Sequence, residues 1–67
     1  MSLYDYQLSK VLSAEDPPFA ALIMAAIRKA DTANVEKLRI AFPEIHDELR
    51  ARYDAPGGVL AAERDER

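Results

Sequence analysis

The chain has no cysteine and only one histidine among its 67 residues. The lack of cysteine excludes disulfides and thiolate metal sites, and one histidine is too few for a zinc ligand set. Glycine is also scarce, since Gly57 and Gly58 are the only two. Without a glycine-rich loop there is no cradle for a phosphate group. We therefore expect no metal and no cofactor.

Charge of one sign and long apolar runs are missing as well. The net charge is −3, and acidic and basic residues alternate, so no long-range field favours nucleic acid or an anionic membrane. The longest apolar run, residues 19–27, is about half of the roughly 20 residues that cross a bilayer. We see no signal peptide, because Lys10 is the first basic residue. These features predict a cytoplasmic protein without a membrane partner.

The same run, Phe-Ala-Ala-Leu-Ile-Met-Ala-Ala-Ile, is the most informative feature present. A helix that is apolar on nearly all sides must be covered by other helices or by a partner. A chain of this length buries only roughly 60% of its unfolded surface. Small domains without disulfides or metals depend on tight packing or self-association. The run therefore indicates association rather than chemistry.

Caps and prolines divide the first half of the chain into two helices. Ser2 caps a first helix, which ends near residues 13–15 because Pro17 and Pro18 follow. Asp16 is the expected N-cap of a second helix over residues 17–30, with Pro17 in its first turn.

Two further helices are expected in the second half. Asp31 or Thr32 caps a helix over residues 33–41, and Pro43 begins another that runs to Tyr53. Within it, Glu48 and Arg52 have the spacing of a supportive ion pair.

The sequence thus predicts an all-α fold, a compact bundle of four short helices. Residues 1–58 form the single domain, and residues 59–67 form a frayed, flexible C-terminal tail. The predicted core consists of the apolar residues at helical spacing: Leu8, Val11, Leu12, Phe19, Leu22, Ile23, Ile27, Val35, Leu38, Phe42, Ile45, Leu49 and Tyr53.

Residues that carry chemistry are few. His46 lies at the margin of the fourth apolar stripe, and Arg50 one turn later repels a metal cation, so we expect its ring to pack against the core. The acidic residues Glu44, Asp47 and Glu48 point away from that stripe and lack the enclosed site that acid–base catalysis requires. We expect no catalytic residues, no small-molecule substrate and no enzymatic activity.

Three apolar residues fall outside the stripes: Tyr6, Met24 and Ile40. Scattered surface hydrophobes are normal in folded proteins. The alternative is that they form a contact surface for a protein partner or a second copy. The apolar surface of the second helix is already larger than one small bundle can cover. Both interpretations stay open.

A DNA-binding regulator is the alternative from another class. The third and fourth helices have a tight connection, as in a helix-turn-helix, with basic residues at Arg28, Lys29, Lys37 and Arg39. However, the fourth helix begins with carboxylates where DNA phosphates would lie. Nucleic acid is therefore not the expected partner.

Residues 19–58, about 60% of the chain, resemble a group of short uncharacterised phage and prophage proteins. The matching pieces are Ala-Leu-Ile-Met-Ala-Ala at 21–26, Ala-Asp-Thr at 30–32, Ala-Phe-Pro-Glu at 41–44 and Ala-Arg-Tyr-Asp-Ala-Pro-Gly-Gly at 51–58. The resemblance implies a helical module of phage origin and assigns no activity or site. The leading hypothesis is a small non-enzymatic protein–protein interaction module that forms a homodimer or binds another protein.

Overall fold

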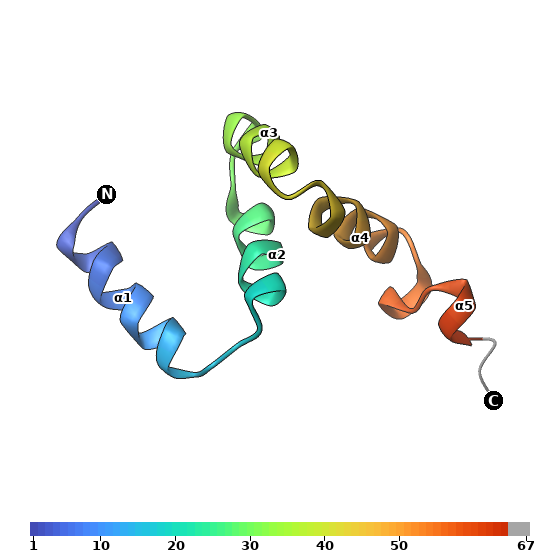
Figure 1. Cartoon of the computed structure of the whole chain (residues 1–67), viewed down its shortest axis with the longest axis horizontal. Coiled ribbons are helices and arrows are strands. Elements are labelled where there is room, and N and C mark those ends of the chain that lie inside the picture. The colour runs from blue at the N-terminus through green and yellow to red at the C-terminus, as the bar shows by residue number, and fades with distance from the viewer. Residues whose placement is uncertain (65–67) are drawn as a thin grey trace.

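The computed structural model describes residues 1–64, which form helices joined by short connections and contain no strand. The elements are α1 (Leu3–Ala14), α2 (Phe19–Lys29), α3 (Thr32–Ala41), α4 (Pro43–Tyr53), the 3-10 turn η1 (Pro56–Gly58) and α5 (Ala61–Arg64). The predicted all-α class with four main helices is confirmed (Figure 1).

Local hydrogen bonds explain where α1 begins and ends. The Ser2 Oγ accepts a bond of 3.2 Å from the amide of Asp5, and the Asp5 carboxylate accepts one of 3.1 Å from the amide of Ser2. This reciprocal capping satisfies two amides that the helix leaves free. At the other end, Asp16 adopts φ +56° and its amide donates to the carbonyl of Ser13 at 3.0 Å.

The conformation of Asp16 corrects the predicted start of α2. A left-handed residue just past a helix ends that helix, so Asp16 terminates α1 instead of capping α2. The N-cap of α2 is Pro18, and the helix begins at Phe19, two residues later than expected. The connection of residues 15–18 is consequently longer than the sequence suggested.

The boundaries of α3 and α4 agree with the sequence. The Asp31 carboxylate caps α3 by accepting a 2.8 Å bond from the amide of Asn34. Phe42 both ends α3 and begins α4, and Pro43 occupies the first turn of α4, where its missing N–H costs nothing. The turn between these helices is therefore a single residue.

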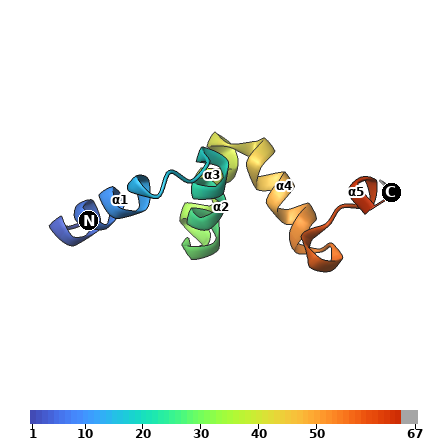
Figure 2. The same cartoon turned by 90° about the horizontal axis from the view of Figure 1, so that it is seen from below.

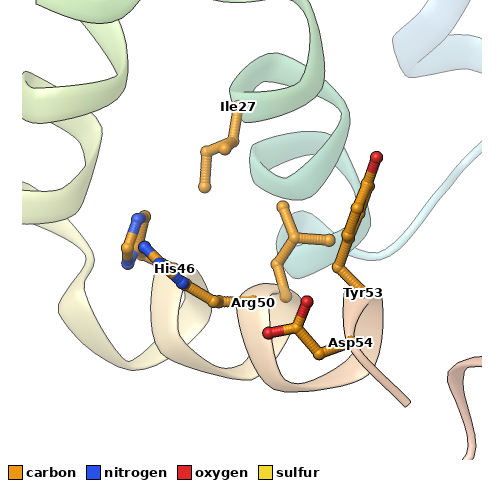
Figure 3. Close-up of a pocket in the computed structure, with 6 residues that line it drawn as sticks. Ile27, His46, Arg50, Tyr53 and Asp54 are labelled. Carbon is orange, nitrogen blue, oxygen red and sulfur yellow. The ribbon is translucent and has the colours of Figure 1, made fainter.

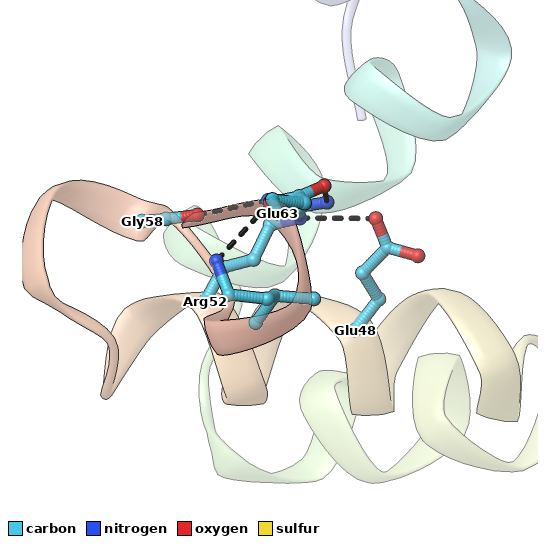
Figure 4. Close-up of polar contacts among 5 residues, drawn as sticks. Glu48, Arg52, Gly58 and Glu63 are labelled. Carbon is cyan, nitrogen blue, oxygen red and sulfur yellow. Dashed lines mark hydrogen bonds and ion pairs between the residues drawn. The ribbon is translucent and has the colours of Figure 1, made fainter. Parts of the chain in front are cut away.

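Arg52 organises the chain after α4 (Figure 4). Its guanidinium donates to the Glu48 carboxylate at 3.0 Å, to the Gly58 carbonyl at 2.8 Å and to both oxygens of Glu63 at 2.9 and 2.7 Å. The carbonyl of Gly58 reaches this position through a turn in which Gly57 and Gly58 have φ of +62° and +73°, values that glycine adopts without strain.

The predicted Glu48–Arg52 pair is thus confirmed, and residues 61–64 of the expected tail form a helical turn bonded to α4. Residues 65–67 of that tail lie outside the described range. The flexibility of the tail stays a prediction.

Within residues 1–64 the backbones of α2, α3, α4 and η1 pack together, and α5 is joined to α4 by the Arg52–Glu63 bonds. In contrast, α1 contacts none of the other elements in this range. Figures 1 and 2 show α1 standing away from α2 at one end of the long axis, α2 and α3 together near the middle, and α4 and α5 continuing towards the other end. The extents are 47 × 28 × 17 Å and the radius of gyration is 14.4 Å. A compact chain of this length has a radius of gyration of roughly 11 Å.

The compactness of the predicted bundle is therefore wrong, and so is part of the predicted core. Leu49 is the one buried residue in the described range, 8% exposed. Six predicted core residues are half-buried: Ile23, Ile27, Val35, Leu38, Phe42 and Ile45. Six others are exposed: Leu8, Val11, Leu12, Phe19, Leu22 and Tyr53. The physical reason is that these residues face positions where the protomer supplies no covering helix.

Candidate functional site

One face of α1 is apolar and exposed. Its members, here called the α1 stripe, are Tyr4, Leu8, Val11 and Leu12, which share a face because they follow helical spacing. Tyr4 is 70% exposed and Val11 57% exposed. In an ordinary domain such a face lies against the core, so this face of α1 is available for a contact.

A second apolar face lies on α2. The half-buried Ile23 and Ile27 are on the inner side of this helix, while Phe19, Leu22 and Ala26, here called the α2 stripe, are exposed beside them. The Phe19 ring also meets the Phe42 ring edge-on, with centroids 5.5 Å apart. This contact holds one end of the α2 stripe in place.

A hollow of about 340 Å³ lies between α2 and α4 (Figure 3). It is lined by Ile27, His46, Leu49, Arg50, Tyr53 and Asp54. The His46 side chain is largely covered, and its Nδ1 lies 3.2 Å from the Asp47 carboxylate. The ring thus packs at the margin of the small core, as the sequence predicts. The hollow is a gap in incomplete packing, and its floor is the only buried side chain of residues 1–64, Leu49.

The accessible area measures how incomplete this packing is. The protomer exposes 5713 Å², whereas a compact folded chain of 7.5 kDa exposes roughly 4,200 Å². This excess of about 1,500 Å² is larger than the area of about 800 Å² that each partner buries in a stable protein interface. The surplus is therefore large enough for an extensive interface.

The three predicted partner-binding residues do not gather into one patch. Tyr6 and Ile40 are exposed, on α1 and α3 respectively, whereas Met24 is half-buried beside a second hollow that Arg52 and Tyr53 also line. The ring of Tyr6 lies 5.8 Å from the Lys10 ammonium on the same helix, a cation–π distance. Tyr6 therefore has a neighbour on its own helix.

The charged residues form local pairs. Arg39 on α3 bonds to Glu36 one turn earlier, and this hydrogen bond lowers the pKa of the Glu36 carboxyl below its ordinary value. The acidic residues Glu44, Asp47 and Glu48 are exposed, as predicted. Within residues 1–64 no cluster of three potential metal-ligating side chains occurs.

The α1 stripe is what sequence reasoning missed as a site. Its spacing was recognised, but the pattern predicts only that a face is apolar and not whether the protomer covers it. The feature of the sequence that could have indicated this exposure is the connection after α1. Two consecutive prolines follow Asp16, and they stiffen the chain and limit how α1 can fold back onto the other helices.

Comparison with protein-family models, curated proteins and solved structures gave no match. Among residues 1–64, no helix combines the length and apolar character needed to cross a membrane.

Proposed function

We propose that this protein is a small, non-enzymatic protein–protein interaction module whose apolar surface is covered by another protein chain, either a second copy or a different partner. The observation that carries this proposal is the surplus of exposed area over that of a compact chain, about 1,500 Å². Much of the exposed apolar surface is on α1, and contiguous apolar patches of this kind mark interaction sites.

The arrangement of the surplus also supports an interface rather than scattered hydrophobes. Tyr4, Leu8, Val11 and Leu12 occupy one face of one helix. An amphipathic helix that presents spaced apolar anchors is a recurring mode of protein recognition. We also propose a phage or prophage origin, on the resemblance of residues 19–58. We further propose a cytoplasmic location, which fits a chain without cysteines to form disulfides.

The test compares two charge substitutions on opposite faces of α1. Val11→Glu places a carboxylate within the α1 stripe, whereas Ser9→Glu places one outside the stripe, on the side of the helix opposite Val11. We expect the unaltered protein and Ser9→Glu to associate, with themselves in sedimentation velocity or with a protein retained from a native-host extract. Val11→Glu should lose that association.

Two results together would show that the proposal is wrong. The unaltered protein would be a monomer at several hundred micromolar, and it would retain the same proteins from the extract as Val11→Glu does. Circular dichroism of each variant checks that the helices remain.

DNA binding by α3 and α4 has less support. The Arg39 guanidinium is engaged by Glu36, and Glu44 and Asp47 are exposed near the start of α4, where they repel phosphates. A gel-shift titration at low salt that gave salt-sensitive binding would favour this alternative.

A further inference from the structure

The α1 and α2 stripes have the same spacing when one of them is read backwards. Along α1, Tyr4, Leu8 and Val11 are separated by four residues and then three. From the end of α2 towards its start, Ala26, Leu22 and Phe19 are also separated by four residues and then three. Apolar positions spaced by three and four residues form the seam between paired helices, and these two seams are in register when the helices run antiparallel.

We infer that α1 of one copy packs antiparallel against α2 of a second copy, so that two chains exchange their first helices. This inference rests on the proposed interaction role and names the partner as a second copy of this chain. In this register three layers form: Tyr4 on Ala26, Leu8 on Leu22, and Val11 on Phe19. The large Tyr4 ring faces the smallest side chain of the α2 stripe, and Leu8 meets Leu22 at the centre.

Length and charge agree with this pairing. The two helices have 12 and 11 residues, so each is about 16–18 Å long and they overlap along their whole length. The antiparallel direction brings Asp5, in the first turn of α1, towards the end of α2 that carries Arg28 and Lys29. The parallel direction would instead place the positive N-terminal ends of the two helix dipoles side by side and would separate Asp5 from these two cations.

The connection between the helices explains why a second copy is favoured over the chain's own α2. Asp16 has φ +56°, and Pro18 has φ −59° and ψ 147°, an extended conformation in which the proline rings fix φ. This short, stiff segment holds α1 away from its own α2, and short hinges that prevent closure promote exchange between copies. An exchanged dimer covers both stripes in each protomer, and the surplus area exceeds the roughly 800 Å² per partner of a stable interface.

Cross-linking between two single-cysteine variants tests the pairing, because the natural chain has no cysteine. Leu8→Cys and Leu22→Cys are purified separately, mixed in equal amounts and mildly oxidised. We expect a disulfide between the two variants on a non-reducing gel, with the 8–22 link identified by mass spectrometry. Ser9→Cys, which lies outside the α1 stripe, is the matched control. A mixture of Ser9→Cys and Leu22→Cys should not give this product.

Three results would overturn the exchange. Leu8→Cys could couple to itself as efficiently as to Leu22→Cys, which would mean that α1 pairs with α1. A variant that carries both Leu8→Cys and Leu22→Cys could give an internal disulfide in a monomer, which would mean that α1 closes on its own α2. The mixture could also give no disulfide at all while circular dichroism shows intact helices.

The unaltered chain provides a test free of folding effects. In a mixture of isotope-labelled and unlabelled copies, filtered NMR spectra should show contacts between Val11 methyl groups of one copy and the Phe19 ring of the other. Their absence at a concentration where sedimentation shows a dimer would exclude this interface. If the chain is a monomer that binds a different protein through Val11, the exchanged dimer is wrong but the proposed interaction role stands. If it is a monomer that binds no protein, both the exchanged dimer and the proposed role are wrong.

Discussion

At the scale of single residues, stability depends on very few side chains. Leu49 on α4 is the one buried residue of the described range and forms the floor of the hollow beside Ile27. Ile23, which the sequence places in the core, is only half-buried. We therefore expect truncation to destabilise the protein most at Leu49 on α4, and less at Ile23 on α2.

We expect Leu49→Ala to lower the free energy of unfolding by roughly 2–5 kcal/mol, since it removes buried methyl groups and leaves a cavity. Ile23→Ala should cost less, because part of that side chain already contacts water. Ile40→Ala is the control: Ile40 is 67% exposed, so its change should stay within about 0.5 kcal/mol. Urea melts of the three variants measure this order. Equal losses for Leu49→Ala and Ile40→Ala would contradict the structure.

Arg52 and Glu63 make a prediction about pH. The hydrogen bonds from Arg52 and, secondarily, from the Leu60 amide lower the pKa of the Glu63 carboxyl from 4.5 to about 2. A carboxyl whose pKa is lowered in the folded state stabilises that state above its unfolded pKa. The attachment of α5 should therefore be complete above pH 4.5 and be lost as the pH falls through about 2.

An NMR titration of the Glu63 carboxyl carbon measures this pKa directly. Arg52→Gln removes the charged donor, so it should return the midpoint towards 4.5. A midpoint near 4.5 in the unaltered protein would show that the Arg52–Glu63 pair does not persist in solution.

At the scale of elements, α1 is a well-capped helix without tertiary support from the described part of its own chain. An isolated helix of 12 residues is marginal in water. The sequence predicted its start at Ser2 and its end near Ala14, because caps and prolines act locally. It could not predict that Leu8 and Leu12 remain exposed, because burial depends on residues distant in the chain.

Hydrogen exchange of α1 should therefore depend on protein concentration. In dilute solution the amides of α1 should exchange much faster than those of α4, because α1 lacks contacts that resist local opening. At concentrations where copies associate, protection of α1 should rise while α4 changes little. Mass-spectrometric exchange at two concentrations measures both. Strong α1 protection that does not vary with concentration would show that α1 packs within its own protomer.

At the scale of the whole molecule, the departure from compactness is the decisive property. The radius of gyration of 14.4 Å exceeds the roughly 11 Å of a compact chain of this length. The connection of residues 15–18 contributes to this shape, since α2 contacts both α3 and α4 while α1 stands apart at one end of the molecule (Figure 2).

Small-angle X-ray scattering of the dissociated protomer tests this shape. The Val11→Glu variant, which should not associate, is suited to the measurement because its substitution lies on α1 and leaves α2, α3 and α4 unaltered. We expect a radius of gyration nearer 14 Å than the roughly 11 Å of a closed bundle. A value near the lower figure would show that α1 folds back onto its own α2.

The sequence by itself determined the all-α class and the bounds of α3 and α4, because Asp31, Phe42 and Pro43 act on the backbone beside them. It also determined which side of each helix is apolar. Only the tertiary structure decided that Asp16 ends α1, that Tyr6, Met24 and Ile40 lie apart, and that the α1 stripe faces water. Caps and spacing act within one turn of a helix, whereas burial is set by the direction in which a four-residue connection points the next helix.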